Sequence, residues 1–251
     1  MLIGERHGRI LEELKKNPNV TVAELSQILF VSEPTVRRDL TELHKKGMIT
    51  KIYGGAILNQ GAADREIPFL LRENEKSAVK TEIGNIAASR INDGMVIMLD
   101  GSTSAYHLVP YIARKKDVIV ITSGAKTAVA LAEANVRTFC TGGQMVIHSF
   151  SYVGKQAEDF VRSINADILF FSCHGISEDG LMTDRAIEEA DLRRVMFSHA
   201  KKRILLCDSS KFGKTCFYNM GSVADADEVI SEAPLPENIA KLVGKNRTAI
   251  E

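Results

Sequence analysis

Three short stretches near the amino terminus place apolar residues every three to four positions, which is the spacing of amphipathic helices. The first stretch runs from Glu5 to Lys16, and Asn17-Pro18 ends it because proline cannot continue a helix. The second follows a capping box, in which the Thr21 side chain caps the helix and the Glu24 side chain accepts a hydrogen bond from the Thr21 amide. Only Phe30-Val31-Ser32 separates it from the third, so the pattern predicts three helices with a tight second turn.

The third helix should begin at Glu33, because Ser32 can accept hydrogen bonds from the first amides of the helix. Pro34 is tolerated in the first turn because it has no amide hydrogen that would be left without a partner. Gly47 is expected to stop it in the left-handed conformation. Residues at i, i+4 and i+7 make one apolar face, and the opposite face is polar and basic. The apolar positions are Val36, Leu40 and Leu43, and the outer positions are Pro34, Arg38, Thr41 and Lys45.

The next nine residues alternate loosely between apolar and polar and end in Gly54-Gly55-Ala56, which predicts a small β-hairpin. Three helices followed by such a hairpin form a winged helix-turn-helix. Residues 34–53 hold five basic and two acidic residues, a net charge of +3, whereas the whole chain has a net charge of +0. A basic charge confined to one surface favours DNA binding over the alternative, an ordinary three-helix bundle with a solvated basic face.

The residues expected to contact DNA lie on the third helix and in the hairpin. Arg37 and Arg38 are about 100° apart on the helix, so one can read base edges in the major groove while the other holds a phosphate. Lys51 and Tyr53 are expected to touch the DNA backbone beside the groove. The complete set is Ser32, Thr35, Arg37, Arg38, Thr41, Lys45, Lys51, Tyr53, Gly54 and Gly55.

Farther along the chain, short apolar runs alternate with amphipathic helices, which predicts a mainly parallel α/β sheet covered on both faces. The small, polar stretch from Asn59 to Arg65 indicates a linker. We therefore expect a DNA-binding domain at 1–57, a linker at 58–75 and an α/β domain at 76–251. Strands are expected at Met95 to Leu99, Val118 to Ile121, Arg137 to Cys140, Ile168 to Ser172, Arg203 to Cys207 and Glu228 to Ser231, and helices at Ser77 to Ile91, Ala105 to Ala113, Lys126 to Ala134, Lys155 to Ser163, Ala186 to Ala200 and Pro236 to Lys245.

Composition narrows the class of protein. The 251 residues are 45% hydrophobic and 25% charged, which suits a globular protein with one small domain and one sizeable core. Charges at Glu5 and Arg6 come too early for a signal segment, and no run is long enough to cross a bilayer. We therefore expect a cytoplasmic protein with no membrane partner.

The cysteines show no CxxC pairing and are expected to be reduced thiols. Cys140, Cys173 and Cys207 lie near predicted strand ends, where a shared metal site is the alternative. Buried cysteine usually acts as a small hydrophobe, so we expect no metal and no cofactor.

The residues that follow the strands are small, polar and rich in hydroxyls, and ligands of open α/β sheets bind beyond the carboxyl ends of the strands. The loop from Asp100 to Ser104 has the outline of a phosphate cradle at the start of a helix. Helix capping alone explains many such loops, but several at one edge favour a small anionic polyol. Neither GxGxxG after a strand nor GxxxxGK[ST] is present, so a sugar phosphate fits better than NAD or ATP. The expected ligand residues are Asp100, Gly101, Ser102, Thr103, Ser104, Thr122, Gly142, Gly143, Asp208 and Lys211.

The chain resembles the DeoR-type regulators of bacterial carbohydrate metabolism over nearly its full length. The resemblance implies a sensor domain related in fold to ribose-5-phosphate isomerase, which binds a phosphorylated sugar rather than converting it. The family wing usually has Arg and His where this chain has Lys51 and Tyr53, and many members have Thr-Asn where this chain has Thr122-Ser123. The matching positions are Ser32, Thr35, Arg37-Arg38-Asp39-Leu40, Leu43, Gly47, Gly54-Gly55-Ala56, Arg72, Lys80, Asp100, Ser102-Thr103, Thr122, Gly142-Gly143, Gly154, Asp167, Gly175-Ile176, Gly180, Glu189-Ala190 and Asp208-Ser209-Ser210-Lys211-Phe212.

These features predict a DNA-binding transcriptional regulator, a repressor of a sugar-metabolism operon, and not an enzyme. One winged helix offers few contacts, so a homodimer or homotetramer should bind the double-stranded operator. In the ligand site, Ser102 and Thr103 would hold the phosphate, Asp100 and Asp208 would accept hydrogen bonds from sugar hydroxyls, and Lys211 would add positive charge.

Two alternatives stay open at this point. The second domain could sense a non-sugar metabolite, because a fold does not fix a function. The chain could also be a sugar-phosphate isomerase fused to a DNA-binding domain, with Glu188 or Glu189, Asp208 and Lys211 moving protons.

Overall fold

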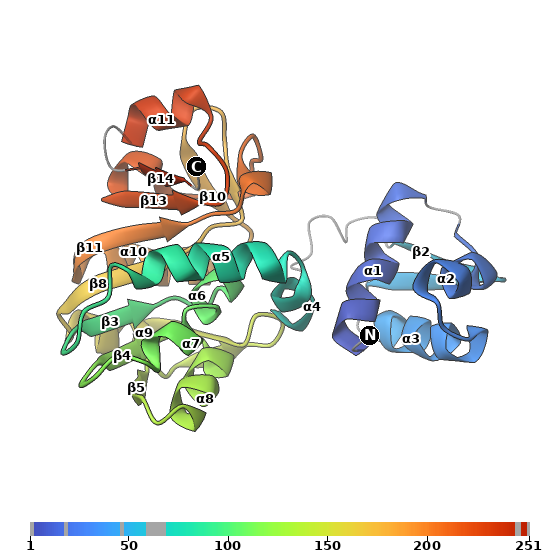
Figure 1. The fold of residues 1–251 in the computed structure, drawn as a ribbon, viewed down its shortest axis with the longest axis horizontal. Helices are drawn as coiled ribbons and strands as arrows, with labels where there is room; N and C mark the ends of the chain where they lie inside the picture. The colour runs from blue at the N-terminus through green and yellow to red at the C-terminus, as the bar shows by residue number, and fades with distance from the viewer. Residues whose placement is uncertain (1–2, 18–19, 46–47, 59–68, 244–246, 250–251) are drawn as a thin grey trace. The chain divides into compact units, whose positions relative to one another are not determined.

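The computed structural model describes residues 3–17, 20–45, 48–58, 69–243 and 247–249 (Figure 1). The chain divides into two compact units, Met1–Lys76 and Ser77–Glu251. We call the first unit the head. Among the described residues, none of the helices is long and apolar enough to cross a membrane.

The head contains the three predicted helices and the predicted hairpin, and also a helix, α4 (Phe69–Asn74), within the stretch 58–75 that was expected to be a linker. Its other elements are α1 (Ile3–Lys16), α2 (Val22–Leu29), α3 (Glu33–Lys45), β1 (Ile49–Ile52) and β2 (Gly55–Leu58). The capping box is confirmed, since the Glu24 amide donates to Thr21 Oγ1 over 3.2 Å and the Thr21 amide donates to Glu24 Oε2 over 2.8 Å. Val36, Leu40 and Leu43 of α3 are buried in the head core, as their spacing predicts. The expected helix stop at Gly47 and the expected linker stretch from Asn59 to Arg65 lie outside the described residues.

The described part of the second unit contains a seven-stranded parallel sheet in the order β14-β13-β11-β8-β3-β4-β5 (Figure 1). A mainly parallel sheet is thereby confirmed. The strands are β3 (Val96–Leu99), β4 (Ile119–Thr122), β5 (Arg137–Cys140), β8 (Ala166–Phe171), β11 (Ala200–Leu206), β13 (Glu228–Ser231) and β14 (Arg247–Ala249).

Apolar clusters lie on both faces of this sheet. Along β8, Ile168 and Phe170 belong to one apolar cluster while Leu169 and Phe171 belong to the other, as the alternation of side chains along a strand requires. Helices α5 (Ser77–Ala88), α7 (Val109–Ile112) and α8 (Ala125–Glu133) contribute to the first cluster. Helices α9 (Lys155–Arg162), α10 (Ile187–Ser198) and α11 (Glu237–Val243) contribute to the second.

The structure corrects one predicted helix. The stretch expected as a single helix from Ala105 to Ala113 is two short ones, α6 (Thr103–Tyr106) and α7. Pro110 lies in the first turn of α7 and has no amide to donate to the Tyr106 carbonyl, so one continuous helix cannot form.

Short antiparallel strands that the sequence analysis did not identify form two further sheets in this unit. Hairpin β6-β7 (Gln144–Val146 and Ser151–Val153) follows β5. A three-stranded sheet joins β9 (Gly175–Ile176), β10 (Leu181–Asp184) and β12 (Tyr218–Ser222) in the order β12-β10-β9. Short 3-10 helices are η1 (Ser209–Lys211) and η2 (Val223–Asp225).

Candidate functional site

Asp39 anchors α3 to α1 from the buried side of the helix. Its side chain is 4% exposed, and it accepts hydrogen bonds from Nε and Nη2 of Arg6 over 2.5 and 2.9 Å. Nε2 of His7 lies 3.1 Å from Asp39 Oδ1. This buried network fixes the rotation of α3, so the residue next to Asp39 in the chain, Arg38, is held on the solvent side.

Arg38 differs from Arg37 and Lys45 of α3 in its lack of an ion-pair partner among the described residues. It is exposed and makes no ion pair with any residue that the structure describes. In contrast, Arg37 Nη2 lies 3.1 Å from Glu33 Oε2, and Lys45 Nζ lies 3.4 Å from Glu42 Oε1. Of the two arginines expected to meet DNA, Arg38 is therefore the one that no carboxylate of the described residues pairs with.

The start of α3 carries two hydroxyls close together. Ser32 Oγ and Thr35 Oγ1 are 3.0 Å apart. The amides of Thr35 and Val36 both donate to the Ser32 carbonyl, which begins the helix at the predicted place. The hydroxyls of Ser32 and Thr35 thus lie beside the first turn of the helix.

The hairpin is tied to α3 by Lys51, whose Nζ donates to Thr41 Oγ1 over 3.0 Å. Tyr53 at the tip of the hairpin is fully exposed. Gly54 has φ +81°, the left-handed conformation that glycine tolerates, and a Cβ at Gly55 would lie 2.6 Å from the Val20 carbonyl oxygen. The paired glycines therefore let the hairpin turn tightly against the start of α2.

In the second unit, the expected ligand residues do lie at the carboxyl ends of strands, but several of their polar atoms bind other protein groups. Asp100 Oδ1 accepts a hydrogen bond from the Ser102 amide over 3.1 Å. Its Oδ2 accepts from the Ser172 amide over 3.1 Å and from Arg193 Nε over 2.8 Å. Ser102 Oγ caps α6 by accepting from the Ala105 amide over 3.1 Å. These groups shape the loop that follows β3.

Asp208 and Lys211 belong to the loop after β11. Asp208 Oδ1 accepts from the Ser210 amide over 3.2 Å and so caps η1. Lys211 Nζ donates to Ser172 Oγ over 2.9 Å and to the Cys173 carbonyl. Because Ser172 also binds Asp100, the loops after β3, β8 and β11 form one hydrogen-bonded network.

The remaining expected residues are in tight turns or buried. Thr122 Oγ1 accepts from the Gly124 amide over 3.0 Å, and Thr103 and Ser104 are buried. Gly142 and Gly143 have φ of +68° and +101°, and a Cβ at Gly143 would lie 2.5 Å from the Val153 carbonyl oxygen. The two glycines allow the chain to fold back into hairpin β6-β7.

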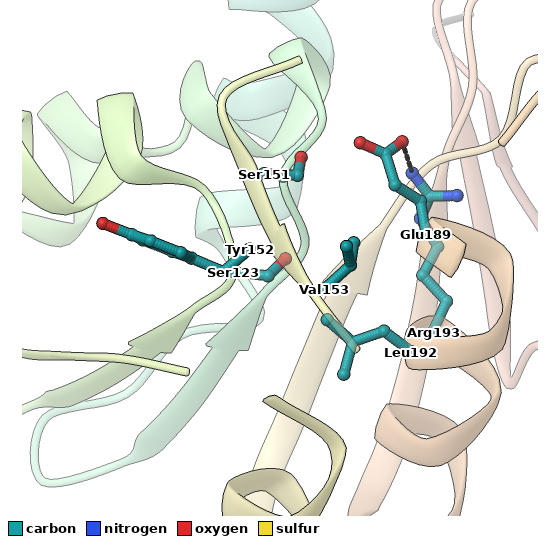
Figure 2. Close-up of a pocket in the computed structure, with 8 residues that line it drawn as sticks. Ser123, Ser151, Tyr152, Val153, Glu189, Leu192 and Arg193 are labelled. Atoms are coloured by element: carbon teal, nitrogen blue, oxygen red, sulfur yellow. Dashed lines mark ion pairs between the residues drawn. The ribbon is translucent and has the colours of Figure 1, made fainter. Parts of the chain in front are cut away.

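A pocket lies at this edge, between the loop after β4, strand β7 and helix α10 (Figure 2). Its volume of about 10 Å³ holds about one water molecule. Of the expected ligand residues, Gly101 lines it. The lining residues are Gly101, Ser123, Ser151, Tyr152, Val153, Glu189, Leu192 and Arg193.

Ser151 presents a buried hydroxyl to this pocket. The residue is 2% exposed, and its Oγ has no hydrogen-bond partner among the described residues. A Cβ at position 101 would lie 2.0 Å from Ser151 Oγ, so the hydroxyl requires glycine there. A buried hydroxyl without a partner is costly, and a ligand hydroxyl could satisfy it.

Arg193 on α10 lies at the centre of a buried acidic cluster. Its guanidinium forms ion pairs with Asp100, Asp184 and Glu189, the last with 3.6 Å between Nη2 and Oε2 (Figure 2). His174 Nδ1 lies 2.8 Å from the other oxygen of Asp184. Burial by itself would raise the pKa of Asp184, but attraction to Arg193 and the contact with His174 outweigh burial and lower it.

Sequence reasoning missed Arg193, Asp184 and Ser151. Arg193 lies in a strongly charged helical stretch, where an arginine normally faces water. The available signal was its spacing, because Arg193 follows Glu189 by one turn and precedes buried Met196 by three residues. Nothing in the local pattern places Asp184 beside it, since that contact depends on an antiparallel strand that was not predicted.

Metal binding finds no support in the described part of the chain, where no group of three or more His, Cys, Asp or Glu side chains could hold an ion. Cys173 and Cys207 are buried. Burial raises the pKa of the Cys173 thiol to about 12 and also raises that of Cys207. Both thiols are therefore protonated near neutral pH.

Two family models match the chain. One, described as the DeoR C terminal sensor domain, matches residues 75–233, and the other, a DeoR-like helix-turn-helix domain, matches residues 6–62. The HTH-type transcriptional regulator YulB of Bacillus subtilis is 32% identical over 98% of this chain and 95% of its own length. The glycerol-3-phosphate regulon repressor of Escherichia coli K12 is 25% identical over 98% of each chain. Among solved structures, ribose 5-phosphate isomerase A of Methanocaldococcus jannaschii has a TM-score of 0.42 and 14% identity over 54% of each chain.

Proposed function

This chain belongs to the DeoR family of DNA-binding transcriptional regulators, and from that premise we propose that it represses a sugar-metabolism operon under the control of a phosphorylated sugar. Its family makes it a regulator rather than an enzyme, which removes the isomerase alternative. The observation that carries the proposal is the hydroxyl-lined pocket at the carboxyl edge of the parallel sheet in the sensor domain. A relative named as a glycerol-3-phosphate regulon repressor supports both the repression and the phosphorylated polyol.

In the proposed DNA complex, α3 enters the major groove and Arg38 reads a base edge. Arg37, Lys45 and Lys51 meet phosphates, and Tyr53 packs beside the groove. A homodimer or homotetramer binds two or more half-sites, because one head with five basic residues in its contact region gives few phosphate contacts. The other proposed contacts are Ser32, Thr35, Thr41, Gly54 and Gly55.

In the proposed sensor complex, the loop from Gly101 to Ser104 faces the phosphate, and Lys211 supplies positive charge nearby. Thr122 and the turn at Gly142-Gly143 shape the same edge. Asp100 and Asp208 already bind protein groups, so we assign them to holding the loops rather than to direct contact with the sugar.

A thermal-shift screen of the full chain tests this proposal. Phosphorylated trioses, pentoses and hexoses are compared with the same sugars without phosphate and with inorganic phosphate. A ligand at 100 times its Kd should stabilise the sensor domain by about 2.7 kcal/mol, which is a readily measured rise in Tm. If no phosphorylated sugar raises the Tm while a metabolite of another class does, the non-sugar alternative replaces the proposal.

A further inference from the structure

We propose that Glu189 recognises the hydroxyl groups of the effector, and that the Ser149 hydroxyl occupies the Glu189 carboxylate until a ligand hydroxyl replaces it. This inference rests on the proposed function, because it assumes that the sensor domain binds a small polyol. Beyond the proposed function, Glu189 is the residue that selects the hydroxyl-bearing end of the ligand, and the hydrogen bond from Ser149 to Glu189 is the contact that the ligand breaks.

Glu189 is the least committed of the three carboxylates around Arg193. Nε and Nη1 of Arg193 donate hydrogen bonds to Asp100 and Asp184, whereas Nη2 is 3.6 Å from Glu189 Oε2, beyond ordinary hydrogen-bond distance. Glu189 is 5% exposed and lines the pocket (Figure 2). Ser149 Oγ donates a hydrogen bond to Glu189 Oε1. A carboxylate accepts about four hydrogen bonds, so Glu189 can accept more.

The chemistry of the pocket fits hydroxyl groups rather than an anion. Glu189 lines the pocket, and its carboxylate repels a phosphate at close range but accepts hydrogen bonds from hydroxyl groups. Each sugar hydroxyl can donate one hydrogen bond and accept others. Ser151 Oγ is buried on the same pocket and has no partner in the part of the chain that the structure describes, so it and Ser123 can bond to a second ligand oxygen. The ligand end that enters here is therefore a neutral polyol, with its charged group directed away from Glu189.

Ser149 links this carboxylate to hairpin β6-β7. It lies in the turn at 147–150 and is 1% exposed, while its neighbour Phe150 has a left-handed φ of +54°. The Phe150 carbonyl accepts from the Ala125 amide over 2.8 Å, which ties the turn to the loop after β4. The pocket has room for about one water molecule, so a sugar can enter only if a wall moves. When the hydrogen bond from Ser149 to Glu189 is lost, the turn at 147–150 loses this contact with α10 and can move away from the pocket.

The inference makes an unusual prediction for Ser149→Ala. If Ser149 competes with the ligand for Glu189, removal of its hydroxyl should tighten ligand binding by about 10-fold, the lower end of the range for a hydrogen bond to a charged group. If Ser149 instead builds the binding site, the same change should weaken binding. Ser163→Ala is the matched control, because Ser163 Oγ donates to the Phe160 carbonyl on the exposed end of α9. The control should leave the ligand Kd unchanged.

Glu189→Gln supplies the second arm and should weaken binding about 10-fold or more. Glu188→Gln is its control, because Glu188 is the exposed neighbour on the same helix. Titration calorimetry on the full chain uses ribose 5-phosphate, fructose 6-phosphate and glycerol 3-phosphate as probes. The Tm of each variant without ligand shows whether it is folded.

The outcomes separate the two proposals. If a probe binds the wild type, Ser149→Ala tightens it and Glu189→Gln weakens it, the inference is supported. If a probe binds the wild type but Ser149→Ala weakens or does not change its Kd, the inference is wrong and the proposed function stands. If none of the three probes binds the wild type, both the inference and the proposed function fail for these sugars.

Discussion

Asp39→Asn should loosen α3, the proposed DNA-recognition helix, from α1 within the head. The change keeps the shape of the side chain but leaves the Arg6 guanidinium facing a neutral amide. The Arg6 side chain is only 11% exposed, and that of His7 is 3% exposed, so water cannot replace the lost carboxylate fully. Breaking a buried ion pair typically costs about 3–5 kcal/mol, and the remaining exposure of Arg6 places this case near 3 kcal/mol.

That loss is large for so small a unit. At about 0.05–0.15 kcal/mol per residue, the 76 residues of the head have a free energy of unfolding of about 4–11 kcal/mol. A cost of about 3 kcal/mol should lower its Tm by about 12–24 °C, at about 4–8 °C per kcal/mol. Operator binding should fall because α3 loses its fixed rotation.

Hydrogen exchange measured by mass spectrometry can resolve the head from the sensor domain within the full chain. Peptides from α1 and α3 should exchange about 100-fold faster in Asp39→Asn, whereas peptides from β8 and β11 should be unchanged. Glu33→Gln is the control on the same helix, since its exposed pair with Arg37 contributes about 0.5 kcal/mol or less. Equal exchange of α3 peptides in Asp39→Asn and wild type would show that the Asp39 network does not hold the helix.

Three further results are expected. Arg38→Ala should weaken operator binding by about 1–3 kcal/mol and relax preference at one base pair per half-site, and gel shifts on operator variants that show neither change would remove Arg38 from base contact. The pKa of Asp184 is lowered in the folded chain, so the stability it contributes is present above its unfolded pKa near 4 and is lost as the pH falls through the folded pKa. Below about pH 4, the free energy of unfolding should therefore fall less steeply with decreasing pH in Asp184→Asn than in the wild type. A thiol reagent at pH 8 should modify exposed Cys140 in the native chain but reach Cys173 and Cys207 only in denaturant, and rapid native reaction of all three would contradict their burial.

The head could be predicted from the sequence because its signals are local. The capping box at Thr21 and Glu24, the spacing of Val36, Leu40 and Leu43, and the paired glycines act within a few residues, and the structure reproduces each. The parallel sheet was also predictable, since continuous apolar runs mark strands that are buried on both faces.

The pocket could not be predicted in the same way. The carboxylates around Arg193 come from the loop after β3, from β10 and from α10, and Arg193 contacts Asp100, which is 93 residues away in the sequence. Helical spacing indicates which side of α10 is buried, but it does not indicate that three carboxylates surround Arg193 on that side. The break between α6 and α7 had a visible signal in Pro110, whereas the pairing of β10 with β12 depends on a partner far along the chain.

The most direct test of the account measures whether ligand binding and DNA binding are coupled. Fluorescence anisotropy gives the Kd of the full chain for a labelled duplex from the regulated promoter, with and without a sugar phosphate that stabilises the sensor domain. A coupling free energy of about 1–3 kcal/mol predicts that the ligand raises the operator Kd by about 5- to 150-fold. An operator Kd that stays the same or falls when the ligand saturates the sensor domain would contradict a repressor released by its sugar.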